Sequence, residues 1–276
     1  MAITAADVNK LRKQTGAGMM DCKNALVETN GDFEAAIDVL RKKGQKVAAK
    51  RGDNDAKEGL IFAQTTEDGK TGVLLRLNCE TDFVAKNDEF RSFMQSLVDV
   101  AMKEMPTSVE ALLGAPYNAE LSVGEKIIEH VGVVGEKLDL NGFDVITADS
   151  VVAYNHPGNQ VATLVGLNSS STDAQDAGRQ VAMQVAAMNP MALSKEGIDK
   201  STIDRELEVG KDLAIQEGKP AEMADKIAQG RLNKFFKENT LLSQAFVRDN
   251  KISIEQFLKN TEDGLTVIDF KRQAMS

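Results

Sequence analysis

The stretch GLIFAQTTEDGKTGVLLRLNCE, residues 59–80, decides the fold class of this chain. It contains two apolar runs, Leu60–Ala63 and Val73–Leu77, and the turn signal Glu67-Asp68-Gly69 separates them. The segment therefore predicts a β-hairpin. A helix is expected after it, because Asn87 is a suitable N-cap and an amphipathic pattern follows. Strand, strand, helix is thus the expected unit of the fold.

The same unit is expected again about 90 residues later in the chain. Asn155-His156-Pro157-Gly158-Asn159 takes the place of the first turn, and a helix that ends at Asn189-Pro190 completes the copy. We therefore expect an α+β fold with a duplicated core built from antiparallel sheets. The aligned segments are residues 59–63 with 150–154, and residues 74–78 with 163–168.

Residues 1–51 are predicted to form a small, mildly basic module in an acidic chain. They carry ten Lys/Arg and six Asp/Glu, whereas the 276-residue chain has 33 and 42, a formal net charge of -9. Three apolar stripes with the i, i+3, i+4 spacing of one helical face indicate three short helices. The first begins with a capping-box pattern, Thr4 with Asp7. The apolar stripe of the third runs to Gly44, and residues 46–59 are expected to be a charged helix end that runs into a linker. The pattern predicts a three-helix bundle of the ubiquitin-associated (UBA-like) type.

An inserted helical hairpin is expected after the second unit. Ser201 begins its first helix, and Gly218-Lys219-Pro220 ends that helix and starts the next. Its apolar seam is thin, so we expect the hairpin to project from the body and to pack on a partner or on a second copy, as a homodimer. The expected seam comprises Ile203, Leu207, Ala214, Met223, Ile227 and Arg231.

The tail alternates like a strand at Leu265–Phe270 and is expected at the edge of the body's sheet. The expected domains are the N-terminal module (1–53), core subdomain N (54–140), the first part of core subdomain C (141–198), the hairpin (199–232) and the return to the core (233–276).

Composition excludes several classes of function. Cys22 and Cys79 show no metal-binding spacing, so we expect no metal and no cofactor. The only histidines are His130 and His156, and no nucleophile motif accompanies them, so hydrolase chemistry is disfavoured and an enzyme is expected only if a partner supplies the chemistry. The absence of a long apolar run or a signal peptide predicts a cytoplasmic protein without membrane contact. Net acidity and 5% aromatic residues disfavour direct nucleic-acid binding.

The segment ETDFVAKN, residues 80–87, is unusual for a loop between a strand and a helix. It places Phe83 directly beside Asp82. One interpretation folds the ring back into the core. The other exposes it as a wedge that inserts into another protein, while the carboxylate disturbs charges there. Met19 and Met20 leave a similar choice between core and contact surface, because adjacent helical positions cannot both face one core.

TDFVAKN, after VLLRLNCE and before a helix, closely resembles the signature of bacterial elongation factor Ts. The N-terminal run LRKQTGAGMMDCKNALVETNGDFEAAIDVLRKKG, residues 11–44, resembles the same family. The likeness extends over nearly the whole chain. Its further motifs are Tyr154-x-His156, residues 185–190, Gly218-Lys219-Pro220 and residues 244–247.

This resemblance implies a guanine-nucleotide exchange factor for the GTPase elongation factor Tu (EF-Tu), in its GDP-bound and nucleotide-free forms. Such a factor makes and breaks no covalent bonds. Positions matching Asp82 and Phe83, within the motif that also contains Thr81 and Val84, would insert near the magnesium site of the GTPase. His156 would touch a different domain of the GTPase, but Pro157 departs from the small residue that is usual there and puts this contact in doubt. The remaining contact positions implied by the family are Arg12, Met19, Met20, Lys23, Val134 and Gly135.

Two other interpretations stay open at this point. The chain could be an interaction scaffold whose UBA-like module binds ubiquitin-like or peptide partners without any effect on nucleotide exchange. Release of labelled GDP from the GTPase distinguishes this scaffold from an exchange factor. The chain could also bind RNA through its basic module, which predicts an affinity that falls steeply with salt.

Overall fold

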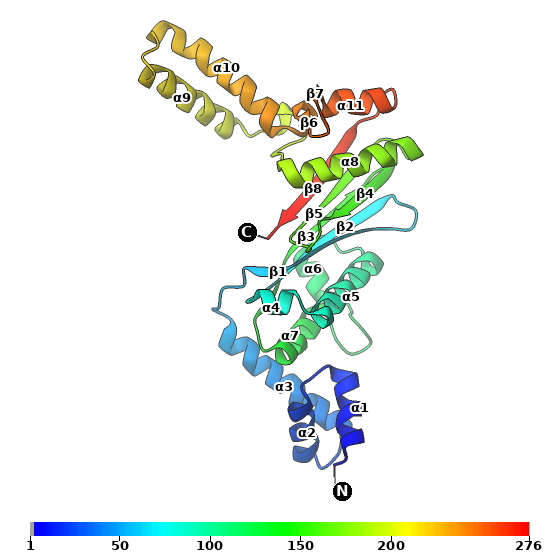
Figure 1. Ribbon diagram of the computed structural model, residues 1–276. Helices are drawn as coiled ribbons and strands as arrows, with labels where there is room; N and C mark the ends of the chain where they lie inside the picture. Colours follow the sequence, from blue (N-terminus) through cyan, green and yellow to red (C-terminus); the bar gives the residue numbers. More distant parts are fainter. Residues whose placement is uncertain (1–2, 276) are drawn as a thin grey trace.

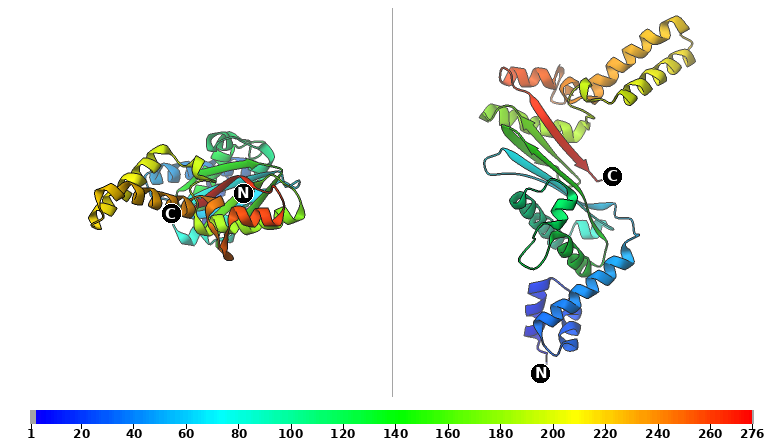
Figure 2. Two further views of the ribbon diagram at one scale, coloured as in Figure 1. Left: turned by 90° about the horizontal axis from the view of Figure 1, so that it is seen from above. Right: turned by 180° about the vertical axis from the view of Figure 1, so that it is seen from behind.

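The computed structural model describes residues 3–275 as an elongated molecule (Figure 1). A helical module lies at one end, a body of helices and sheets follows, and a helical hairpin projects from the other end. The view from behind shows the same arrangement (Figure 2). The projection of the hairpin agrees with the expectation from its thin seam.

The N-terminal module consists of α1 (Ala5–Thr15), α2 (Met19–Glu28) and α3 (Phe33–Arg51). Thr4 caps α1, and the capping box with Asp7 is confirmed. The module has a core of its own, so it can hold its shape beside the body. Its likeness to ubiquitin-associated domains stays a prediction. The buried residues of this core are Val8, Leu11, Ala17, Cys22, Ala25, Leu26 and Ala36.

The helix α3 continues past the end of its apolar stripe at Gly44 to Arg51, in agreement with the charged helix end that was expected there. Gly44 lies where α3 crosses α7 (Val123–Val134). A Cβ at Gly44 would lie 2.8 Å from the carbonyl oxygen of Ile128, so a larger residue does not fit. This glycine serves the close approach of two helices rather than a turn.

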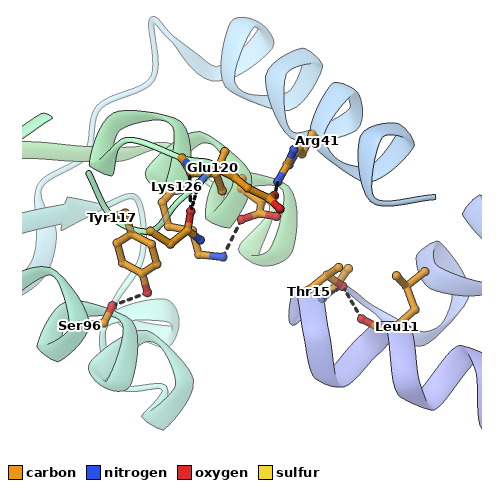
Figure 3. A network of polar contacts seen from close by, with 11 residues as sticks. Leu11, Thr15, Arg41, Ser96, Tyr117, Glu120 and Lys126 are labelled. Atoms are coloured by element: carbon orange, nitrogen blue, oxygen red, sulfur yellow. Dashed lines mark hydrogen bonds and ion pairs between the residues drawn. The ribbon is translucent and has the colours of Figure 1, made fainter. Parts of the chain in front are cut away.

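Polar contacts also join the module to the body (Figure 3). Arg41 of α3 donates from Nη2 to Oε2 of Glu120 at 3.0 Å. Within the body, Lys126 of α7 pairs with Glu129 of the same helix, with Nζ and Oε2 separated by 2.6 Å. The partly exposed pair of Arg41 and Glu120 adds little stability but joins α3 to the body.

The body contains two three-stranded antiparallel sheets, which confirms the predicted α+β class. In each sheet the third strand pairs with the second strand of the hairpin, and the tail forms an edge strand as expected. The first sheet has the order β1 (Glu58–Thr65), β2 (Thr71–Cys79), β3 (Leu138–Thr147). The second has the order β4 (Ser150–Asn155), β5 (Val161–Leu167), β8 (Val267–Ala274), and β6 (Ala245–Phe246) pairs separately with β7 (Asp249–Ser253).

The two sheets pack face to face, with helices on their outer faces (Figure 1). Both faces of the strands are buried, which explains why they read as continuous apolar runs rather than as an alternating pattern. The inner layer holds Ile61, Ala63, Leu74, Ile146, Val151, Ala162 and Leu164. The outer helices are α4 (Asp82–Ala85), α5 (Asp88–Glu104), α6 (Val109–Gly114) and α7 on the first sheet, and α8 (Thr172–Met188) and α11 (Ile254–Thr261) on the second.

The duplication extends to irregular features of the two halves. A register shift falls between Arg76 and Leu77 of β2 and between Gly166 and Leu167 of β5, at positions that the sequence alignment equates. The helices α5 and α8 both end in a left-handed residue that precedes a proline, and both have 17 residues. These residues are Met105 (φ 45°) and Asn189 (φ 44°).

The hairpin consists of α9 (Lys200–Gln216) and α10 (Ala221–Asn239), joined through Gly218 at φ 77°. Its seam contains small residues, among them buried Ala214 and Ala228. Met223, which we expected on the seam, is exposed, because the buried position is that of Ala224. Short 3-10 turns at Lys195–Gly197 and Leu241–Ser243 flank the hairpin.

The division into domains stays a prediction. The expected boundary at residues 140–141 falls inside β3, which pairs with β2 from Leu138 to Thr147. The helix α10 continues past the expected hairpin end at residue 232 to Asn239.

Candidate functional site

The segment Thr81–Val84 forms a turn at the end of β2 in which Phe83 is exposed and the other three residues are half-buried. Thr81 is the N-cap of α4, and its Oγ1 accepts from the backbone N of Val84 at 3.4 Å. Ala85 is buried, and Val84 packs partly against the core of the first sheet. One side of the turn is therefore anchored. Asp82 and Phe83, the first two residues of α4, lie on the other side. We call the Asp82–Phe83 pair the wedge.

The ring of Phe83 is not folded back into the core. The residue is 83% exposed, the highest value among the exposed large apolar residues of the described chain. Exposure of this extent forgoes roughly 1.5–3 kcal/mol of burial and leaves the whole ring face available to another molecule.

Asp82 carries the negative charge of the wedge. Its Oδ2 accepts from Nζ of Lys86 at 2.6 Å, one helical turn away. This hydrogen bond and the charge of Lys86 hold the pKa of Asp82 below its usual value. The carboxylate is therefore ionised at neutral pH and lies beside the exposed ring of Phe83.

The base of the turn is fixed by the link between α7 and β3. Glu136 accepts from Oγ1 of Thr81 at 2.7 Å and from its backbone N at 3.0 Å. Val134 and Gly135 directly precede Glu136. The structure therefore brings these two predicted contact positions next to the wedge segment, although they are some 50 residues away in sequence.

The N-terminal contact positions lie on the module's surface. Arg12, near the end of α1, and Lys23 of α2 are exposed. Met19 and Met20 are 56% and 62% exposed, so both methionines face solvent and neither fills the core. Their role in binding stays a prediction.

Sequence reasoning missed Val27, which is 57% exposed on α2. It lies seven residues after Met20 and four after Lys23, so the three share one helical face. The spacing itself could have revealed it, because the buried stripe of α2 excludes this position.

His156 lies on the second sheet, in the exposed turn between β4 and β5, and it does not join the wedge. Its Nδ1 and the hydroxyl of Tyr154 are 2.9 Å apart. The backbone N of Asn159 donates to the carbonyl of His156 at 2.9 Å, and Gly158 has φ 88°. A turn with positive φ at its third residue favours proline at its second, so Pro157 suits this conformation.

The other histidine, His130 of α7, lies inside the body. Its ring stacks on Phe93 with 3.9 Å between centroids, and its Nε2 is buried without a hydrogen-bond partner among the described residues. Burial, with the positive charge of Lys126, lowers the pKa of His130 to about 4. This histidine is neutral at physiological pH.

Within residues 3–275, no three His, Cys, Asp or Glu side chains gather in a way that could hold a metal ion. None of the helices described in that range is both long and apolar enough to cross a membrane.

Comparison with known proteins places the chain in one family. A family model described as "Elongation factor TS" matches residues 80–276. The elongation factor Ts of Christiangramia forsetii is 52% identical over 273 residues, which cover 99% of this chain and 98% of that protein. Those of Amoebophilus asiaticus and Cytophaga hutchinsonii are both 48% identical, over 273 and 275 residues, with 98% and 99% of their lengths covered. The chain belongs to the elongation factor Ts family of translation elongation factors.

Proposed function

We propose that this protein is a guanine-nucleotide exchange factor for elongation factor Tu and that its wedge promotes the release of GDP. The observation that carries the proposal is the exposed ring of Phe83 beside the ionised Asp82, on a turn that is anchored at its base. A wedge needs all three properties. It must protrude, it must carry charge, and it must not fold away when it meets its partner.

The action rests on coupling between two ligands of one GTPase. If the factor binds the nucleotide-free GTPase more tightly than the GDP-bound form, GDP must weaken the factor's binding by the same ratio. Magnesium and backbone donors hold the nucleotide phosphates in such proteins, so a small displacement removes much of their electrostatic stabilisation. Burial of the Phe83 ring in the partner would offset that loss by roughly 1.5–3 kcal/mol.

Further contacts would hold the factor in place while the wedge acts. We propose that the exposed face of α2, with Met20, Lys23 and Val27, docks on the GTPase together with Arg12 and Met19. Val134 and Gly135 would contact it beside the wedge, and His156 would reach a second domain. The factor would perform no chemical reaction and would act in the cytoplasm, where translation takes place.

A homodimer through α9 and α10 is the remaining part of the proposal. It is supported by the exposed apolar side chains that this hairpin carries. They are Val209, Leu213, Ile215 and Met223.

The test is the release of a fluorescent GDP from elongation factor Tu with and without this protein. An exchange factor accelerates release in proportion to its concentration until it saturates. The scaffold alternative predicts binding with no acceleration, and that outcome would refute the proposal. Binding that requires RNA and falls steeply with salt would favour the RNA-binding alternative.

A further inference from the structure

Glu136 holds the residue before the wedge with both of its carboxylate oxygens. Oε1 accepts from Oγ1 of Thr81 at 2.7 Å, and Oε2 accepts from its backbone N at 3.0 Å. Glu136 lies in the short link between α7, which ends at left-handed Gly135, and β3, which begins at Leu138. Regular elements on both sides of the link therefore fix the position of this carboxylate.

Glu80 makes the reverse connection. Its Oε1 accepts from the backbone N of Lys137 at 2.6 Å, so each of the two segments donates a backbone N–H to a carboxylate of the other. Because the β2–β3 ladder ends at the pair Cys79 and Leu138, these bonds continue the pairing beyond the sheet. Arg51 of α3 donates to Oε2 of Glu80 at 2.7 Å. We call Glu80, Thr81, Glu136 and Lys137 the clasp.

The wedge cannot orient itself without such support. The helix α4 has four residues, whereas an isolated helix needs about 12–15 residues to be even marginally stable. Phe83 is exposed, so packing of its ring does not set the direction of the turn. The hydroxyl of Thr81 donates a hydrogen bond to Glu136, and this orients the lone pairs of Oγ1 toward the N–H of Val84. The direction of the wedge therefore depends on two supports: the packing of Val84 and Ala85 on the core, and the position of Thr81, which Glu136 holds.

We propose that Glu136 is a positioning residue for nucleotide exchange, which holds the wedge in the direction in which Phe83 enters elongation factor Tu. The inference rests on the proposed function. Glu136 need not contact the partner, since it acts through Thr81. A carboxylate that accepts two hydrogen bonds restrains its donor more strongly than a neutral acceptor does. With one of these bonds lost, fewer encounters would present the ring in the productive direction.

The test compares release of fluorescent GDP from elongation factor Tu by variants of the full chain. Glu136→Gln keeps the size of the side chain but can accept from only one of the two Thr81 donors. It should lower the maximal release rate roughly tenfold. The half-saturating concentration should change much less, because the contacts of the N-terminal module remain. Thr81→Ser retains both donors and should keep most of the activity.

Glu120→Gln is the matched control. Like Glu136, Glu120 is a carboxylate that accepts a hydrogen bond, here from Arg41 of α3 at 3.0 Å, but it belongs to the contact between module and body rather than to the clasp. The Glu120→Gln variant should accelerate GDP release from elongation factor Tu as much as the parent chain does. A loss equal to that of Glu136→Gln would show that the loss of any hydrogen-bonded carboxylate has this effect, and it would overturn the inference.

A second comparison, made in the Phe83→Ala variant, distinguishes a positioning role of Glu136 from a role in folding. In Phe83→Ala there is no ring to direct, so adding Glu136→Gln should cause no further loss. A further tenfold loss there, or a parental rate for Glu136→Gln alone, overturns the inference while the proposed function stands. Failure of the parent chain to accelerate release overturns both. If Glu136→Gln does not fold, Thr81→Val carries the same comparison, because it removes the hydroxyl donor and the helix cap.

Discussion

Gly44 of α3 and Gly132 of α7 bring their helices into backbone contact, since a Cβ on Gly132 would lie 2.9 Å from the Cα of Gly44. In the other direction, a Cβ on Gly44 would lie 2.8 Å from the carbonyl oxygen of Ile128. Packed interiors do not yield easily to an added methyl group. The module that carries Met19 and Met20 therefore contacts the body through two helices packed so closely that no side chain fits between them at these glycines.

Gly44→Ala should lower the free energy of unfolding by roughly 1–3 kcal/mol, because the added methyl group forces α3 away from α7. The net effect is smaller than the steric strain alone, since alanine favours the helix over glycine by about 1 kcal/mol. Urea unfolding followed by circular dichroism measures the change.

Gly230→Ala is the control for this prediction. Gly230 also lies inside a helix, α10, but a Cβ there would meet no atom within 4 Å. The same substitution should therefore raise the free energy of unfolding by up to about 1 kcal/mol. If both variants shift in the same direction, the argument from helix contact is wrong.

Phe83→Ala should leave the free energy of unfolding within about 0.5 kcal/mol of the parent, because its ring is exposed. It should nevertheless slow GDP release strongly. The neighbouring Val84→Ala should behave in the opposite way, with a loss of about 1 kcal/mol in stability and a smaller effect on release, because Val84 packs on the core. Parallel unfolding and release measurements check both. A large loss of stability in Phe83→Ala would favour the core interpretation of the ring.

Features set by neighbouring residues could be predicted from the sequence. The hairpin of residues 59–80 and the helix caps at Thr4 and Asn87 depend on a few adjacent side chains, and the structure confirms them. The helix contact at Gly44 was not predicted, because its partner, Gly132, lies in a distant helix that local patterns did not reveal. The helices α6 and α7 and strand β3 were not predicted at all.

The candidate site shows the same limit. The sequence singled out Asp82 and Phe83 but left open whether the ring faces inward, because the local sequence is compatible with both orientations. The answer depends on which side of α4 meets the core, and the buried residue there is Ala85. Glu136 was not identified, because its bonds to Thr81 depend on how β2 and β3 pair.

The lowered pKa of His130 should make the free energy of unfolding depend on pH. Its pKa is about 4 in the folded protein and about 6.5 in an unfolded chain, so the unfolded state binds the proton more tightly. Its neutral form therefore supports the fold fully above about pH 6.5, and this support is lost as the pH falls toward 4, by about 3 kcal/mol at most. His130→Leu should show a flatter dependence between pH 6.5 and 5, where carboxylates contribute little. Urea unfolding at several pH values tests this, and an unchanged slope in the variant would contradict it.

The hairpin predicts the oligomeric state. If a second copy covers α9 and α10, the protein should sediment as a dimer, and Leu213→Glu should shift it toward the monomer by placing a charge on the exposed apolar face. Ile268→Glu is the control, because Ile268 is similarly exposed on β8, away from the hairpin. A parent chain that sediments as a monomer at all concentrations would show the homodimer proposal to be wrong.

The alkylation rates of the two cysteines should report on whether the clasp restrains the residues next to it. Burial and the negative charge of Glu136 raise the pKa of Cys79 to about 12, and burial raises that of Cys22, so neither thiol should react in the folded protein at pH 8. The Sγ of Cys79 also donates to the carbonyl of Thr81 at 3.2 Å, directly beneath the wedge. Glu136→Gln removes the charge and loosens Thr81, so it should speed alkylation of Cys79 while Cys22, in the core of the module, keeps its parental rate. Mass spectrometry of the labelled peptides distinguishes the two sites. Equal acceleration at both would indicate global unfolding, and no acceleration at Cys79 would show that the clasp does not restrain this segment.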